Sequence, residues 1–111
     1  MREKILYVVI PCYNEEEVLP ETARQLKEKM LSLMERGLIA QNSRIVFVND
    51  GSKDRTWPII RELHEQDPLY AGVNLTRNRG HQNALLAGLM TVKDDCDITI
   101  SIDADLQDDL D

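Results

Sequence analysis

Short runs of β-branched and aliphatic residues alternate along the chain with segments whose apolar residues recur at helical spacing. The strand-like runs cover residues 5–10, 44–49, 70–75 and 98–102. The segments with helical spacing lie between them, around residues 19–34, 56–66 and 81–92. Strict alternation of strands and helices with short connections is typical of a parallel sheet covered by helices. We therefore predict an α/β fold of the three-layer, doubly wound kind with a mainly parallel sheet.

The segment between the first two strands has the pattern of an amphipathic helix. Its apolar residues recur at spacings of three and four: Leu19, Ala23, Leu26, Met30, Leu33 and Met34. Asn14 is placed to cap this helix, and the three glutamates that follow it suit a positive helix N-terminus. Gly37 is expected to end the helix.

The two later helices differ in how much polar surface they carry. In segment 56–66, Pro58 fits the first turn, Ile60 and Leu63 face inward, and Pro68 follows the end. Segment 81–92 is almost wholly apolar, so it should be buried on both sides. A chain of 111 residues offers little to cover its outer side. We therefore expect exposed apolar surface there and self-association.

The composition indicates one soluble domain with a local excess of acid. The chain is 42% hydrophobic and 30% charged, and the last nine residues supply −5 of the net charge of −7. This balance, without a basic stripe, argues against a nucleic acid partner. The longest apolar run is about six residues, far below the ~20 that cross a bilayer, so we expect a cytoplasmic location. Cys12 and Cys96 lack the spacing of a disulfide framework or zinc site and are predicted to be free thiols.

Unusual residues follow the first two strands, at the edge where a parallel sheet binds its ligands. The first strand leads into Pro11, Tyr13, Asn14 and Glu15, and the ring of Tyr13 can stack on a base. The second strand leads into Asp50, whose carboxylate can accept a hydrogen bond from a ring N–H or a sugar hydroxyl. Each feature alone also fits an ordinary cap or turn.

The third and fourth strands are followed by the charges expected of a diphosphate site. Arg77 and Arg79 precede a helix, whose N-terminus favours an anion, although they could equally neutralise nearby acids. His81 fits a helix start more simply than a ligand role. Asp103 and Asp105 can turn toward one Mg²⁺ or Mn²⁺, although a terminal acidic run also fits a solvated tail. The combination at four strand ends indicates a nucleotide-diphosphate site.

Four stretches at these strand ends resemble the N-terminal, nucleotide-binding half of inverting family 2 glycosyltransferases, which have the Rossmann-like GT-A fold. They are VVIPCYNEEEVL (8–19), RIVFVNDGSKDRTW (44–57), LTRNRGHQNALLAGL (75–89) and ISIDADLQDD (100–109). The last two are most similar to the polyprenyl-phosphate sugar transferases, the dolichol-phosphate mannose synthase and bactoprenol glucosyltransferase group. The resemblance implies that residues 1–111 form the nucleotide-sugar-binding half of a GT-A domain, truncated after the fourth strand. The acceptor-binding half and the usual catalytic base would then be absent.

The resemblance also implies roles for single residues. Asp103 and Asp105, with Gln107 as third ligand, would hold Mg²⁺ or Mn²⁺ against the sugar-nucleotide diphosphate, which makes the two aspartates the expected catalytic residues. The nucleotide-binding residues would be Pro11, Tyr13, Asn14, Glu15 and Asp50, with Arg77 toward the diphosphate. The family often has a second acid where this chain has Asn49.

The implied reaction is transfer of a sugar, with inversion, from a UDP- or GDP-linked donor to an acceptor. We expect that acceptor to be a lipid phosphate and the full-length protein to lie at the cytoplasmic face of a membrane. Residues 1–111 alone are expected to be inactive. Asp108 and Asp109 are not assigned as general base, because a base needs geometry to an acceptor whose site is absent.

Two other classes of protein share parts of this pattern. A phospho-acceptor signalling module also has a doubly wound sheet and an acidic Mg²⁺ site, but its first strand should end in paired acids, where this chain has Pro11 and Cys12. A sugar nucleotidyltransferase would need a glycine-rich loop bearing Lys or Arg after the first strand, and this chain has none there.

Overall fold

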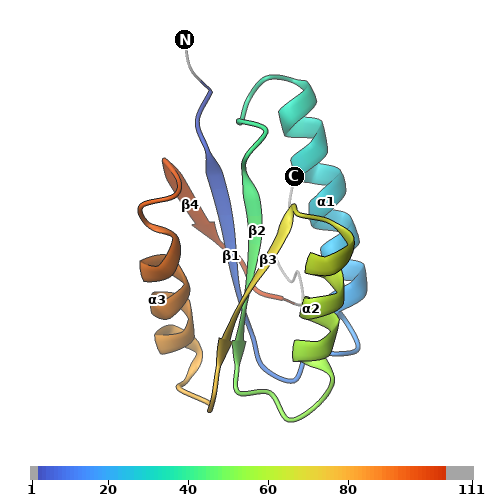
Figure 1. The fold of residues 1–111 in the computed structure, drawn as a ribbon, viewed down its shortest axis with the longest axis vertical. Coiled ribbons are helices and arrows are strands. Elements are labelled where there is room, and N and C mark those ends of the chain that lie inside the picture. Colours follow the sequence, from blue (N-terminus) through green and yellow to red (C-terminus); the bar gives the residue numbers. More distant parts are fainter. Residues whose placement is uncertain (1–2, 105–111) are drawn as a thin grey trace.

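The computed structural model describes residues 3–104, which form one sheet with helices on both faces (Figure 1). The elements follow in the order β1 (Leu6–Cys12), α1 (Leu19–Glu35), β2 (Arg44–Asp50), α2 (Thr56–Gln66), β3 (Tyr70–Leu75), α3 (His81–Val92) and β4 (Ile98–Ser101). The predicted alternation of strands and helices is confirmed.

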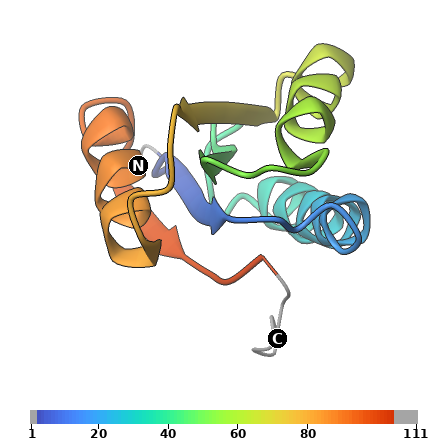
Figure 2. The same cartoon turned by 90° about the horizontal axis from the view of Figure 1, so that it is seen from below.

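The sheet is parallel throughout, with the strand order β3-β2-β1-β4. The chain builds outward from β1 through β2 to β3 and then returns to the other side of β1 to add β4. Figure 2 shows α1 and α2 on one face of the sheet and α3 on the other. This is the predicted three-layer arrangement, and its winding direction changes between β1 and β4, where such sheets bind ligands.

Alternate residues of the two central strands point to opposite layers of the core. Ile10 and Phe47 pack toward α1 and α2, whereas Val9 and Val48 pack toward α3, and all four are fully buried. Helix α3 approaches the sheet closely at Gly88. A Cβ added there would lie 2.6 Å from Val48 Cγ2 and 2.7 Å from Val9 Cγ1.

Helix α1 begins where its apolar periodicity begins, later than the predicted cap at Asn14 implies. It starts at Leu19 with Pro20 in the first turn, and the preceding Val18 offers no side-chain cap. The predicted Asn14 cap is wrong. Asn14 lies upstream in a left-handed conformation with φ of 53°, and its side chain is hydrogen-bonded to another loop.

The predicted end of α1 at Gly37 is confirmed. Gly37 has φ of +71°, and the N–H groups of Gly37 and Leu38 donate to the carbonyl oxygens of Met34 and Leu33, both at 3.0 Å. These two bonds form a Schellman motif, which satisfies carbonyls at the end of a helix.

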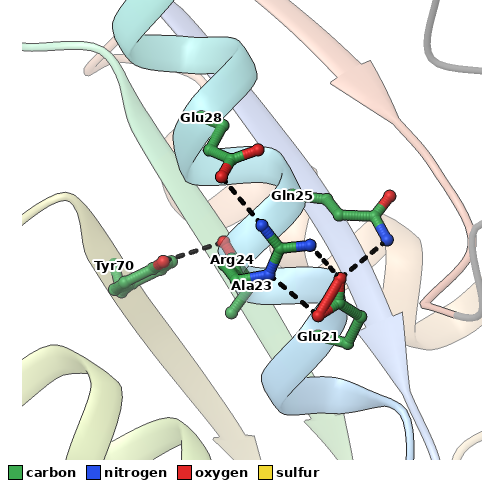
Figure 3. Close-up of polar contacts among 6 residues, drawn as sticks. All are labelled: Glu21, Ala23, Arg24, Gln25, Glu28 and Tyr70. Atoms are coloured by element: carbon green, nitrogen blue, oxygen red, sulfur yellow. Dashed lines mark hydrogen bonds and ion pairs between the residues drawn. The ribbon is translucent and has the colours of Figure 1, made fainter.

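Tyr70, the first residue of β3, holds α1 against the sheet (Figure 3). Its hydroxyl donates to the carbonyl oxygen of Ala23 at 2.8 Å, and its ring packs 6.1 Å from that of Phe47. Burial, with the nearby charge of Asp67, raises the pKa of Tyr70 to about 12. On the solvent side of α1, Arg24 pairs with two glutamates, an exposed arrangement that adds little stability.

Helix α3 and strand β4 leave apolar side chains in solvent. Leu86, Met90, Ile98 and Ile100 are between 46% and 56% exposed, whereas the sheet-facing side of α3 is buried. The expected exposed surface on α3 is therefore present, and self-association stays a prediction. Among the described residues, no helix is both long and apolar enough to cross a bilayer.

Candidate functional site

A cavity of about 440 Å³ lies at the carboxyl edge of the sheet, within the size range of roughly 300–1,000 Å³ typical of small-molecule sites. All four strands contribute to its wall, either through their last residues or through the segments that follow them. The lining residues are Pro11, Cys12, Tyr13, Glu15, Asp50, Asn78, His81, Asp103 and Ala104. The topology thus gathers side chains that lie up to about ninety residues apart in the chain.

The loop after β1 presents Tyr13 and Glu15 because Asn14 turns the chain between them. The backbone N–H of Asn14 donates to Ser52 Oγ, and its Oδ1 accepts from the backbone N–H of Lys53, both at 2.9 Å. These bonds hold the loop against the loop that follows β2. Tyr13 is 42% exposed, so its ring is accessible to a ligand.

The end of β2 is buried, and the side chains of Asn49 and Asp50 both make hydrogen bonds there. Asp50 is only 2% exposed, and its Oδ1 accepts from the backbone N–H of Arg79 at 2.6 Å. The preceding Asn49 donates through Nδ2 to Asn74 Oδ1 at 2.8 Å and accepts from the backbone N–H of Ser52 at 3.2 Å. Asn49 therefore joins β2 to β3 and to the following loop, and it is not among the cavity residues.

Asp103 is held between two contacts on the segment that follows β4. Before it, the N–H of Ile102 donates to the carbonyl oxygen of Val9 at 3.3 Å. After it, the carbonyl oxygen of the buried Ala104 accepts a hydrogen bond from the hydroxyl of Thr22 in α1. The segment therefore crosses from β1 to α1, which places the Asp103 carboxylate on the cavity wall.

The Asp103 carboxylate is chemically suited to a hard divalent cation. Its side chain is 52% exposed, so its oxygens can reach an ion in the cavity, and His81 Nε2 lies 3.7 Å from its Oδ1. Residues 3–104 contain no group of three His, Cys, Asp or Glu that could hold a metal by itself. Asp105 and Gln107, the other predicted ligands, lie outside the described residues.

Cys12 reaches the cavity wall but does not supply a nucleophile. Burial, reinforced by the negative charge of Glu15, raises the pKa of the Cys12 thiol far above its usual value. The thiol donates to the carbonyl oxygen of Ile10 at 3.4 Å. Since the thiolate is the reactive form, this cysteine is inert at neutral pH. Cys12 and Cys96 are both free thiols, as predicted.

The structure brings together many, but not all, of the predicted site residues. Those on the cavity wall are Pro11, Tyr13, Glu15, Asp50 and Asp103. Asn14 and Arg77 do not line it, so their contacts with a nucleotide stay predictions. Cys12, Asn78 and Ala104 also line the cavity and were not predicted to do so, and His81 was expected at a helix start rather than as a ligand. Asn78 and His81 lie beside Arg77 and Arg79, the two residues predicted to matter in this loop, so the sequence indicated the stretch but not which of its residues line the cavity.

The fold and the cavity define an α/β domain whose cavity lies at the switch point of a doubly wound sheet. Residues 7–111 match the protein family described as Glycosyl transferase family 2. The match spans nearly the whole chain, and the chain belongs to this family.

Several curated proteins are similar to this chain over nearly its whole length. The uncharacterized glycosyltransferase YkoT of Bacillus subtilis is 52% identical over 108 residues, which are 97% of this chain and 32% of that protein. The prophage bactoprenol glucosyl transferase homolog of Escherichia coli is 42% identical, covering 91% of this chain and 30% of that protein. The undecaprenyl-phosphate 4-deoxy-4-formamido-L-arabinose transferase of Pseudomonas aeruginosa is 38% identical, covering 93% and 28%. The chain thus spans about a third of the length of these relatives.

Two solved structures share the fold. The mannosyltransferase PcManGT of Pyrobaculum calidifontis, solved with GDP-Man and Mn²⁺, superposes with a TM-score of 0.74 at 24% identity, over 95% of this chain and 28% of that one. Residues 1–349 of TarS from S. aureus give a TM-score of 0.68 at 21% identity, over 91% and 27%. The likeness confirms the predicted GT-A fold class.

Proposed function

We propose that this chain is the donor-binding half of an inverting glycosyltransferase. Residues 1–111 bind a nucleotide-diphosphate sugar and a divalent cation, and the acceptor-binding half belongs to a longer protein. The observation that carries the proposal is the position of the Asp103 carboxylate, on the wall of a cavity that also presents Tyr13 and Asp50. An aromatic ring, a buried acid and a metal-binding acid around one cavity are the groups that a nucleotide diphosphate requires.

The residues after β1 and β2 form the nucleoside end of the proposed site. The exposed ring of Tyr13 stacks on the base, and Pro11 and Glu15 complete the wall beside it. Asp50 accepts a hydrogen bond from the base. Because one of its oxygens is already held by the N–H of Arg79, the carboxylate meets the base in a fixed orientation.

The residues after β3 and β4 form the diphosphate end of the proposed site. Asp103, together with Asp105 and Gln107, holds Mg²⁺ or Mn²⁺, and Arg77 approaches the diphosphate from the β3 side. When bound, such an ion acts as a Lewis acid toward the leaving diphosphate. The Mn²⁺ and GDP-Man bound to the mannosyltransferase of the same fold support this choice of ligands. Asp103 orients the ion from a backbone segment held on both sides.

The acceptor is proposed to be a polyprenyl phosphate. The support comes from relatives whose names include bactoprenol glucosyl transferase and an undecaprenyl-phosphate sugar transferase. With a lipid acceptor, we propose that the full-length protein lies at the cytoplasmic face of a membrane, acts in glycan or cell-wall synthesis and has no nucleic acid partner. The exposed apolar residues of α3 and β4 supply the surface for the proposed self-association.

A binding experiment with matched aspartate variants tests the proposal. UDP or GDP with Mn²⁺ at a hundred times its Kd stabilises a protein by about 2.7 kcal/mol, a rise in Tm of roughly 10 °C or more for a domain of this size. Asp103→Ala should abolish this rise. Asp94→Ala removes the same charge from the exposed turn between α3 and β4, at the opposite edge of the sheet, and should preserve it. The absence of a metal-dependent rise with either nucleotide would overturn the proposal.

A further inference from the structure

The turn that follows β2 lies in direct backbone contact with the loop that joins β3 to α3 (residues 76–80). Gly51 has φ of +67°, and a Cβ added to it would lie 2.3 Å from the backbone nitrogen of Asn78 and 2.4 Å from the carbonyl carbon of Arg77. No side chain fits at that distance. The two segments can lie this close only because residue 51 is glycine.

A charged hydrogen bond beside Gly51 holds the same loop. Asp50 Oδ1 accepts from the backbone N–H of Arg79 at 2.6 Å, and Asp50 is buried. Hydrogen bonds to an ionised carboxylate are among the stronger ones in proteins. The Asp50–Gly51 turn therefore contacts three successive residues of the loop, 77 to 79.

The β3–α3 loop and the first residue of α3 each bring a side chain to the cavity. Asn78 and His81 both line it, and His81 lies 3.7 Å from Asp103. Within the loop, Asn78 Oδ1 accepts from the N–H of Gly80 at 3.0 Å, which links Asn78 to the residue that precedes α3. A displacement of the loop at Gly51 would shift both side chains relative to Asp103.

We infer that the Asp50–Gly51 turn is a positioning element: it sets the β3–α3 loop so that Asn78 and His81 face the diphosphate end of the cavity. Asp50 thereby has a second role besides its proposed contact with the base, because one of its carboxylate oxygens binds the backbone N–H of Arg79 in the loop. This inference rests on the proposed function, because it assumes that a nucleotide diphosphate occupies the cavity.

Two glycine variants with matched backbone strain separate positioning from strain alone. Gly51→Ala introduces a Cβ into backbone atoms, whereas Gly37→Ala has a similar φ of +71° but no atom within 4 Å of the new Cβ. A misplacement of about 1 Å can cost on the order of a hundredfold in a preorganised site, so Gly51→Ala should weaken UDP or GDP binding with Mn²⁺ by at least about tenfold in calorimetry. Gly37→Ala should bind like the wild type. Equal affinities for the two folded variants would overturn the inference.

A second pair of variants tests the hydrogen bond without requiring Gly51→Ala to fold. Asp50→Asn and Asp50→Ala both remove the charge offered to the base, but only asparagine keeps an acceptor for the Arg79 N–H. Hydrogen exchange followed by NMR should show the Arg79 amide protected in the wild type and in Asp50→Asn, and exchanging at least about tenfold faster in Asp50→Ala. Equal exchange in the two variants would refute the positioning role.

The two tests also distinguish failure of the inference from failure of the proposed function. Amide exchange at Arg79 needs no ligand, so it reports on the loop even if no nucleotide binds. If the wild-type protein binds neither UDP nor GDP with Mn²⁺, the proposed function fails, whatever the exchange rates show. If it binds and Gly51→Ala binds equally well, only the positioning role fails.

Discussion

The hydroxyl of Thr22 is predicted to position Asp103 at the proposed metal-binding end of the cavity, although Thr22 does not line the cavity. It donates to the carbonyl oxygen of Ala104, the residue after Asp103, and both residues are 2% exposed. Thr22→Val keeps the shape and the β-branch of the side chain but removes the donor. Thr22→Ser keeps the hydroxyl and serves as the matched control.

The size of the effect follows from the burial of the acceptor. An unsatisfied buried carbonyl costs about 1–3 kcal/mol, unless the segment lifts away from α1 to find water. Without the Thr22 hydroxyl, the segment would keep the hydrogen bond before Asp103, from the N–H of Ile102 to the carbonyl oxygen of Val9 at 3.3 Å, but would lose the one after it. Because this cost falls only on the state with Asp103 on the cavity wall, loss of the donor shifts the population toward the lifted segment, and about 1.4 kcal/mol of this cost corresponds to a tenfold loss of affinity.

The assay is calorimetric titration of UDP or GDP in the presence of Mn²⁺, paired with urea unfolding of each variant. We expect Thr22→Val to bind about tenfold more weakly than Thr22→Ser, with a loss in the free energy of unfolding of no more than about 1–3 kcal/mol. If the two variants bind equally, the Thr22 hydroxyl does not position Asp103, and the reasoning from the Ala104 contact is refuted.

Two further predictions concern stability. Gly88→Ala should lower the free energy of unfolding measured in urea. The new methyl group would overpack against the stiff, buried side chains of Val9 and Val48, which costs about 1–3 kcal/mol and exceeds the gain of about 1 kcal/mol in helix propensity. Unchanged or increased stability would show that α3 can shift away from the sheet at little cost. Lys27 Nζ lies 2.7 Å from the Asp67 carboxylate, and its hydrogen bond lowers the pKa of Asp67 despite partial burial. The pair therefore stabilises the fold at pH values above about 4, the pKa of an aspartate in the unfolded chain. This stabilisation is lost as the pH falls through the lower pKa that Asp67 has in the folded protein. Asp67→Asn should therefore be less stable than the wild type at pH 7, by at most about 1 kcal/mol for a partly exposed pair, and the difference should vanish in acid; a difference that persists at pH 2 would contradict this account.

Most element boundaries could be predicted because the local pattern and the tertiary structure demand the same residues. The predicted bounds of α2, β3 and α3 agree with those observed. Strands β2 and β4 differ from their predicted ends by one residue, and β1 differs most: it was predicted over residues 5–10 but runs from Leu6 through Pro11 to Cys12. Val9 bonds to the segment after β4, so Pro11, two residues on, faces the same side, where β4 has already ended. The missing N–H of proline therefore leaves no strand partner unsatisfied.

The wrong prediction for Asn14 shows where local reasoning ends. An asparagine before three glutamates and an apolar periodicity satisfies every local rule for a helix cap. Its side chain is instead used by the backbone of Lys53, 39 residues away in sequence, and the helix begins at Leu19. Nothing near Asn14 in the sequence indicates that partner.

The sequence by itself determined the order of strands and helices, the layered α/β class and the family motifs, because hydrophobic periodicity and turn chemistry are local properties that survive in a linear reading. It also identified which four strand ends carry the chemistry. Only the tertiary structure decided which groups meet. It placed Asn78 and His81 on the cavity wall and bonded the Asn14 side chain to a neighbouring loop. It also brought Gly51 against the β3–α3 loop and the Thr22 hydroxyl against the carbonyl oxygen of Ala104. The physical reason is that contacts between loops depend on the order of the strands and on differences of a few tenths of an ångström in distance, and a local sequence pattern contains neither.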